Sequence, residues 1–225
     1  KACRRLSAIR VISLRNAFVD LQHILDEEYH FDDESFVRGR RLITRGLAAA
    51  KANIKQSNFL TAQLAVGVIM HTLQDFYSHS NWIELGNRIA YSTLIRADLE
   101  FDNIAGRYRS RLNQGVHTHL QDRGRWLRRD PIQWKCSHGG PLDRTRQTEP
   151  RGGINKDKVD SEHGSLHALA AQVAIDATSQ LLQDIRGAAG DADFLRWAMR
   201  DTLCLTDPSM LWGYGAILDT VNKRM

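Results

Sequence analysis

Residues 57–82 read SNFLTAQLAVGVIMHTLQDFYSHSNW, and this stretch decides the fold. Its large apolar residues recur with the spacing of an α-helix, at Leu60, Leu64, Ile69, Leu73 and Phe76. Few polar side chains interrupt them, so the helix is apolar almost all round. A helix with no polar face belongs inside a bundle. The sequence therefore predicts a central, buried helix that ends near Trp82.

The stretches on either side show helical periodicity as well. We expect amphipathic helices over residues 4–28, from 33 to 54, within 89–107, over 161–187 and from 191 to 204. The apolar stretch 211–221 contains two glycines and favours a strand. The fold class is therefore mainly α, with residues 1–205 as one helical domain and residues 206–225 as a separate tail.

The composition is that of an ordinary globular protein. Apolar residues make up 42% of the 225 residues and charged residues 25%, which excludes disordered and fibrous classes. No apolar run approaches the roughly 20 residues that a membrane-spanning helix needs.

The positive charge is concentrated in one segment. The formal net charge is +5, but residues 106–158 hold 13 Lys and Arg against 5 Asp and Glu. Three of the four prolines also lie there, so we expect a basic, loop-rich insertion over residues 106–160. Such a loop could attract phosphates or an anionic membrane surface, and a solvated connector is the alternative. No nucleic-acid-binding motif accompanies the charge, which makes nucleic acid a weak candidate partner.

Cys3, Cys136 and Cys204 form no CxxC pair, so the sequence argues against a zinc site built from thiolates. One disulfide with a free thiol and three buried free thiols both remain open.

The predicted central helix carries a strip of ionisable residues. His71, Asp75 and His79 are four residues apart and therefore share one helical face. Burying an unpaired aspartate costs several kcal/mol, about 3–5, so this face requires compensation. A divalent metal supplies it, because imidazole and carboxylate are ordinary zinc ligands. The alternative is a buried hydrogen-bonded string of His, Asp and His.

Two other segments offer groups of the same kind. His163 and His167 are four apart at a predicted helix start, and His30 precedes a helix-capping aspartate. Together these residues suffice for two zinc ions, and Asp75 is the natural bridge between the ions. The six predicted ligands are His30, His71, Asp75, His79, His163 and His167. For His23, His117, His119 and His138 we expect solvated roles outside any metal site.

Several motifs resemble one family. HTLQDFYSHSNW (71–82), YHFDDE (29–34), CSHGG (136–140), RGGINKD (151–157) and EHGSLHALAAQ (162–172) resemble the Het-C region. This region occurs in fungal heterokaryon-incompatibility proteins, in the von Willebrand factor A domain-containing protein 7 group and in bacterial relatives. The tail residues 215–220 are similar to the opening strand of a von Willebrand A domain. The resemblance implies a larger secreted or cell-surface protein.

The Het-C region is in turn distantly similar to zinc-dependent phospholipases C and single-strand nucleases. This similarity implies a helical bundle with zinc ions in a cleft, with ligands at His30, His71, Asp75, His79 and His163. His167 stands where those enzymes have an acid. A third zinc ion would require a segment upstream of this sequence.

Two functions follow from this resemblance. The first is a zinc-dependent hydrolase of phospholipid or another phosphodiester, in which Asp75 orients or deprotonates the attacking water. The alternative is a non-catalytic module, stabilised by zinc, of a larger extracellular protein that contains von Willebrand A domains.

Overall fold

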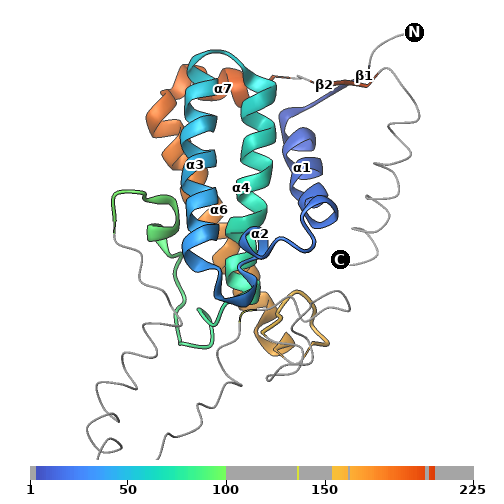
Figure 1. Ribbon diagram of the computed structural model, residues 1–225. Helices are drawn as coiled ribbons and strands as arrows, with labels where there is room; N and C mark the ends of the chain where they lie inside the picture. The colour runs from blue at the N-terminus through green and yellow to red at the C-terminus, as the bar shows by residue number, and fades with distance from the viewer. Residues whose placement is uncertain (1–3, 100–135, 137–153, 162, 201–202, 206–225) are drawn as a thin grey trace, which may run out of the picture.

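The computed structural model describes residues 4–99, 136, 154–161, 163–200 and 203–205 (Figure 1). The described chain is mainly helical. Its α-helices are α1 (Ala8–Gln22), α2 (Glu27–His30), α3 (Phe36–Lys55), α4 (Phe59–His79), α6 (His167–Ala189) and α7 (Asp191–Ala198). Single turns of 3₁₀-helix lie at η1 (Asp32–Glu34), η2 (Ser92–Ile95) and η5 (Gly164–Leu166). Strands β1 (Arg4–Leu6) and β2 (Leu203–Leu205) pair antiparallel. The mainly α prediction is confirmed.

Helix α4 occupies the centre of the bundle, as its sequence predicts. It packs against α1, α3 and α6, and Figure 1 shows it between α1 and α3 with α6 behind. Most of its side chains are buried, among them Val66, Met70 and Phe76, whereas Leu64 near its start is exposed. The largely apolar helix is therefore covered by neighbours over most of its surface, which reduces exposed apolar area.

Helix α4 ends at His79, three residues before the predicted end. Ser80 leaves the helical conformation with ψ of 167°. Its hydroxyl donates to the carbonyl of Phe76 and accepts the backbone N–H of Trp82. The Ser80 hydroxyl thus binds the N–H of Trp82, which in a continuing helix would donate to the carbonyl of Ser78, and the chain turns away.

Other boundaries also differ from the sequence-based expectation. The predicted helix over residues 4–28 is two helices, because the chain turns at residues 23–26 between α1 and α2. Helix α6 begins six residues later than expected, after η5, passes through Gly187 and ends at Ala189, and the next residue is Gly190, whose φ is +85°. In the predicted helix 89–107 the described part holds only η2. Cys204 lies in β2 rather than in a helix.

Some predictions fall outside the described residues. These are the tail 206–225 and the basic insertion, of which Cys136 and residues 154–160 are the described parts. Cys136 is buried and carries a free thiol. Among the helices that the structure describes, none combines the length and apolar character that a membrane span requires.

An aromatic cluster surrounds the C-terminal half of α4. The Phe76 ring lies edge-on to Phe31 with centroids 5.2 Å apart, and it also contacts Phe36, Trp82 and Tyr91. Phe31 and Phe36 are fully buried. Such ring pairs add about 0.5–1.5 kcal/mol beyond the apolar area that they bury. The cluster fixes α2 and the start of α3 against α4.

Residues 154–161, here called the strap, lie against the same end of α4. The backbone N–H of Lys156 donates to the carbonyl of Ser78 at 3.2 Å. The Lys156 ammonium donates to the carbonyl of Ser80 at 2.8 Å and to Glu84 at 3.0 Å. The strap is therefore attached to the residues that terminate α4.

Helices α1 and α4 cross closely at Gly67. A Cβ atom there would lie 2.7 Å from the carbonyl oxygen of Ile12 and 2.7 Å from the Cβ of Arg15. We expect Gly67→Ala to push α1 away and to lower the free energy of unfolding by about 1–3 kcal/mol. Urea unfolding measures this loss. Gly187→Ala in α6 is the matched control, since a Cβ there meets no atom within 4 Å. An equal effect of both substitutions would contradict the close crossing.

Candidate metal centre

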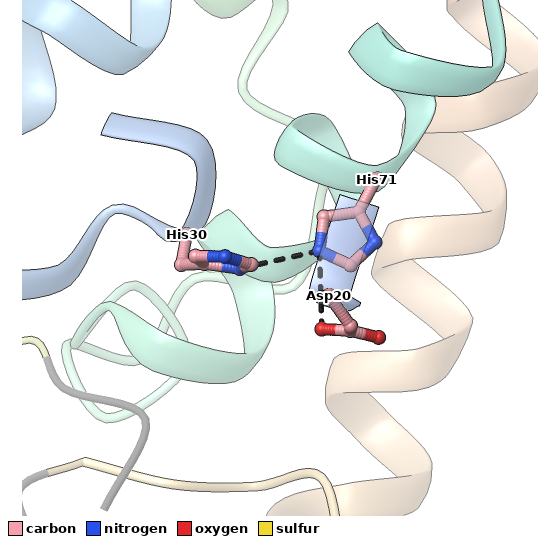
Figure 2. A group of neighbouring side chains, drawn as sticks. All are labelled: Asp20, His30 and His71. Atoms are coloured by element: carbon pink, nitrogen blue, oxygen red, sulfur yellow. Dashed lines mark hydrogen bonds and ion pairs between the residues drawn. The ribbon is translucent and has the colours of Figure 1, made fainter. Parts of the chain in front are cut away.

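Four side chains from three helices meet beside the middle of α4. Asp20 comes from α1, His30 from the last residue of α2, and His71 and Asp75 from α4. His71 Nε2 lies 3.2 Å from His30 Nδ1, 3.0 Å from Asp75 Oδ2 and 3.5 Å from Asp20 Oδ1. His30 Nδ1 lies 2.9 Å from Asp75 Oδ2. Figure 2 shows Asp20 and His30 both directed at the His71 ring.

Local structure explains why these four side chains converge. His71 and Asp75 share a face of α4 because they are one helical turn apart. Phe31 follows His30 in a left-handed conformation, with φ of 58°, and its buried ring packs on Phe76. That contact places His30 over the same face. Asp20 is carried by α1, which the crossing at Gly67 holds against α4.

The hydrogen bonds of His30 determine which of its nitrogens faces the cluster. His30 Nε2 lies 3.0 Å from the carbonyl oxygen of His23, which can only accept, so this nitrogen carries a proton. In the neutral ring, Nδ1 is therefore the nitrogen without a proton, and it faces the carboxylate of Asp75. Two acceptors facing each other at 2.9 Å repel unless a proton or a metal ion lies between them.

The charges in the cluster reinforce one another. Burial by itself would raise the pKa of Asp75, but the neighbouring His71 and His30 outweigh it and hold this pKa well below its ordinary value. Burial would lower the pKa of His71, yet the charge and hydrogen bond of Asp75 leave it raised. The cluster therefore keeps a carboxylate charged in a place where His30 and His71 are 2% and 6% exposed. A buried anion of this kind requires a cationic partner.

The four separations that involve His30 or His71 are close to those between ligands of one metal ion. Ligand bonds of 2.0–2.2 Å in a tetrahedral site place neighbouring ligand atoms about 3.3–3.6 Å apart. These four separations, from 2.9 to 3.5 Å, differ from the tetrahedral values by a few tenths of an ångström. In the described part of the chain, the ligand atoms that all lie within 4.8 Å of one another belong to Asp20, His30 and His71. Two imidazole nitrogens with two carboxylate oxygens suit zinc better than magnesium or calcium, which prefer oxygen ligands alone.

His79, which the sequence also places on this strip, has other partners. Its Nδ1 lies 3.2 Å from the carbonyl oxygen of His30 and 3.4 Å from Asp32. Its Nε2 lies 2.9 Å from Asp157 of the strap. The ring is fully buried. Although burial lowers the pKa of His79, Asp157 and Asp32 leave it raised well above its ordinary value.

The two histidines near the start of α6 lie at the strap. His163 Nδ1 is 3.4 Å from Glu84 Oε1, and His167 Nδ1 donates to the carbonyl of Lys156 at 2.7 Å. Of the six ligands that the sequence predicts, the four-residue cluster therefore contains His30, His71 and Asp75. His79, His163 and His167 make their described contacts with backbone carbonyls and carboxylates, and their predicted role as ligands stays a prediction.

Sequence reasoning missed two residues of this region. Asp20 is one acid on an amphipathic helix, and nothing in its spacing separates it from a solvated residue. Asp157 lies in the RGGINKD motif, which points to the segment but not to its contact with His79. His23 was expected to be solvated, and its ring stacks on Tyr29 with its Nδ1 2.7 Å from Asp26.

Known proteins match most of this chain. The family described as the VWA7 N-terminal domain matches residues 2–123 and 124–195. The chain belongs to this family. The chain is 34% identical over 184 residues to von Willebrand factor A domain-containing protein 7 of Homo sapiens, covering 76% of this chain and 21% of the relative. The protein of the same name from Mus musculus is 33% identical over 205 residues, covering 84% of this chain and 23% of the relative.

Membership of the VWA7 N-terminal domain family confirms one part of the resemblance drawn from the motifs. The chain spans about a fifth of the length of these curated relatives, so the activity of a whole protein does not follow from the match. No solved structure matches the chain. The Het-C assignment and the phospholipase C-like arrangement of the bundle therefore stay predictions.

Proposed function

We propose that this VWA7 N-terminal domain binds one divalent cation, zinc, through Asp20, His30, His71 and Asp75. The observation that carries the proposal is the convergence of His30 Nδ1, His71 Nε2 and Asp75 Oδ2 within 3.2 Å of one another. His30 Nε2 faces the carbonyl of His23, so Nδ1 is the ring nitrogen that faces His71 and Asp75. The hydrogen bond of Nε2 to a backbone carbonyl also fixes the ring, as is usual for histidines that bind metals.

The proposal is one ion rather than the two that the sequence suggests. In the part of the chain that the structure describes, the residues that group within ligand distance are Asp20, His30 and His71, and Asp75 adjoins them. The other predicted ligands lie outside this group: His79 faces Asp157, His163 faces Glu84 and His167 faces the carbonyl of Lys156. We therefore propose that the metal ion joins helices α1, α2 and α4.

We expect the domain to bind about one zinc ion per chain after removal of metal by a chelator and titration with zinc. Binding should raise the melting temperature, because a ligand at about 100 times its Kd stabilises the folded state by about 2.7 kcal/mol. Elemental analysis and calorimetry measure the two effects. Asp26→Asn, an exposed acid near His23, is the control that should bind as the wild type does. Less than about half an ion, with no change in melting temperature, would contradict the proposal.

A second candidate function is hydrolysis of a phosphodiester at this centre. Asp20 is 45% exposed, so one side of the cluster is accessible to solvent, whereas purely structural zinc sites are closed. Bound zinc would supply a Lewis acid for a phosphoryl oxygen. In this function His30, His71 and Asp75 would hold the ion, and Asp20 would leave its fourth position to water and accept a proton from it.

A chromogenic phosphodiester distinguishes this function from that of a non-catalytic module. Hydrolysis that is lost with chelator, restored by zinc and absent in Asp75→Asn supports the hydrolase. Full zinc binding without turnover supports a metal-stabilised module of a larger protein with von Willebrand A domains. A phospholipid substrate and a membrane surface as partner remain proposals that rest on the motifs.

A further inference from the structure

The ring of His79 is held between two oxygen atoms. Nδ1 faces the carbonyl of His30 at 3.2 Å, and Nε2 faces a carboxylate oxygen of Asp157 at 2.9 Å. A carbonyl and an ionised carboxylate accept hydrogen bonds and cannot donate them. The His79 ring is therefore engaged at both nitrogens, by the main chain of His30 on one side and by the strap on the other.

We propose that His79 is a positioning residue, through which Asp157 of the strap holds the metal ligand His30. The inference rests on the proposed zinc site. His79 donates to the backbone carbonyl of His30, so it fixes the main chain from which the His30 ring projects. His23 fixes the same ring from its other side through Nε2.

The strap places a carboxylate beside the buried ring of His79. His79 is fully buried, and Asp157, which is 36% exposed, supplies the anion at Nε2, with Asp32 at 3.4 Å from Nδ1. Without Asp157 the buried ring loses its partner at Nε2, so its orientation relative to the carbonyl of His30 is no longer fixed from that side. The position of His30 then depends on the strap.

Zinc affinity measured by competition with a chromophoric chelator tests this role. We expect Asp157→Asn and His79→Gln to bind one ion each, as the wild type does, but about 10–100-fold more weakly, as substitutions behind metal ligands generally do. The double variant should be no weaker than the weaker single one, because both substitutions break the same chain of contacts. The visible absorption band of bound Co²⁺ should shift in both variants.

Ser161→Ala is the matched control on the strap. It removes the hydrogen bonds from the Ser161 hydroxyl to the carbonyls of Asn155 and Lys158, and it does not touch His79. We expect it to leave zinc affinity and the Co²⁺ band unchanged. An equal loss of affinity in Ser161→Ala would overturn the inference, because general loosening of the strap would then explain the result.

Two further outcomes would also overturn it, and they separate it from the proposed function. A loss of one bound ion in His79→Gln would make His79 a ligand. Unchanged affinity in both Asp157→Asn and His79→Gln would leave the zinc site intact and remove the role of His79. If the wild type itself binds no zinc, the proposed function fails, and the inference that rests on it fails as well.

Discussion

Asp75→Asn should abolish zinc binding at concentrations that saturate the wild type. One oxygen of Asp75 lies 2.9 Å from His30 Nδ1 and 3.0 Å from His71 Nε2, so it joins the two imidazole ligands. Asparagine keeps the size and one carbonyl oxygen but loses the negative charge that attracts the cation. Elemental analysis of the purified variant measures the loss.

The same substitution should destabilise the metal-free domain. The pKa of Asp75 is held well below its ordinary value, so its charge contributes stability at neutral pH and the folded state is weakened when that charge is removed. Breaking a buried ion pair by removal of one partner costs about 3–5 kcal/mol. Urea unfolding in the presence of chelator isolates this effect from the loss of metal.

Zinc content and melting temperature, compared with those of two histidine variants, show whether Asp75 acts as a metal ligand. His71→Ala removes one ligand, and His79→Ala should weaken binding without changing the number of ions, so Asp75→Asn should be the most damaging of the three. If Asp75→Asn retains zinc and melts as the wild type does, Asp75 is a hydrogen-bonded core residue. Both the bridging role and the hydrolase would then have to be abandoned.

The central helix and the chemistry on it could be predicted from the sequence, because both follow from local spacing. Residues 59–76 lack a polar face, which requires burial wherever the chain folds. His71 and Asp75 share a face by helical geometry alone, and the structure brings their side chains within 3.0 Å. His30 was predicted as a ligand because no capping role explained it, and in the structure its Nδ1 lies 2.9 Å from Asp75.

The other contributors depend on contacts between segments far apart in the chain. Asp20 reaches His71 because Gly67 lets α1 approach α4, and a single acid in an amphipathic helix carries no sign of that approach. Asp157 reaches His79 across 78 residues of chain through the strap. Helical spacing placed His79 on the correct face of α4. Spacing alone could not show that an aspartate and a backbone carbonyl would occupy both of its nitrogens.

Lys156→Met should be the most destabilising substitution in the strap, with a loss of about 3–5 kcal/mol in the free energy of unfolding. The ammonium of Lys156 is fully buried and donates to Ser80 and to both carboxylate oxygens of Glu84, at 3.0 and 3.2 Å. Methionine fills most of the volume but leaves Glu84 without its cation in a largely buried place. Urea unfolding measures the loss, which is a large share of the 5–15 kcal/mol typical of a domain.

The double variant Lys156→Met with Glu84→Gln separates the charge pair from the packing. Burial lowers the pKa of Lys156, and it would raise the pKa of Glu84 if His163 and Lys156 did not hold that pKa low. Each charged group loses hydration when it is buried, and the opposite charge of the other group compensates for that loss. Removing both charges should therefore restore most of the stability that removing one destroys. If the double variant is instead as unstable as Lys156→Met, the damage comes from the lost hydrogen bond to the carbonyl of Ser80 at the end of α4. Lys156 would then act as a cap for that helix rather than as the partner of Glu84.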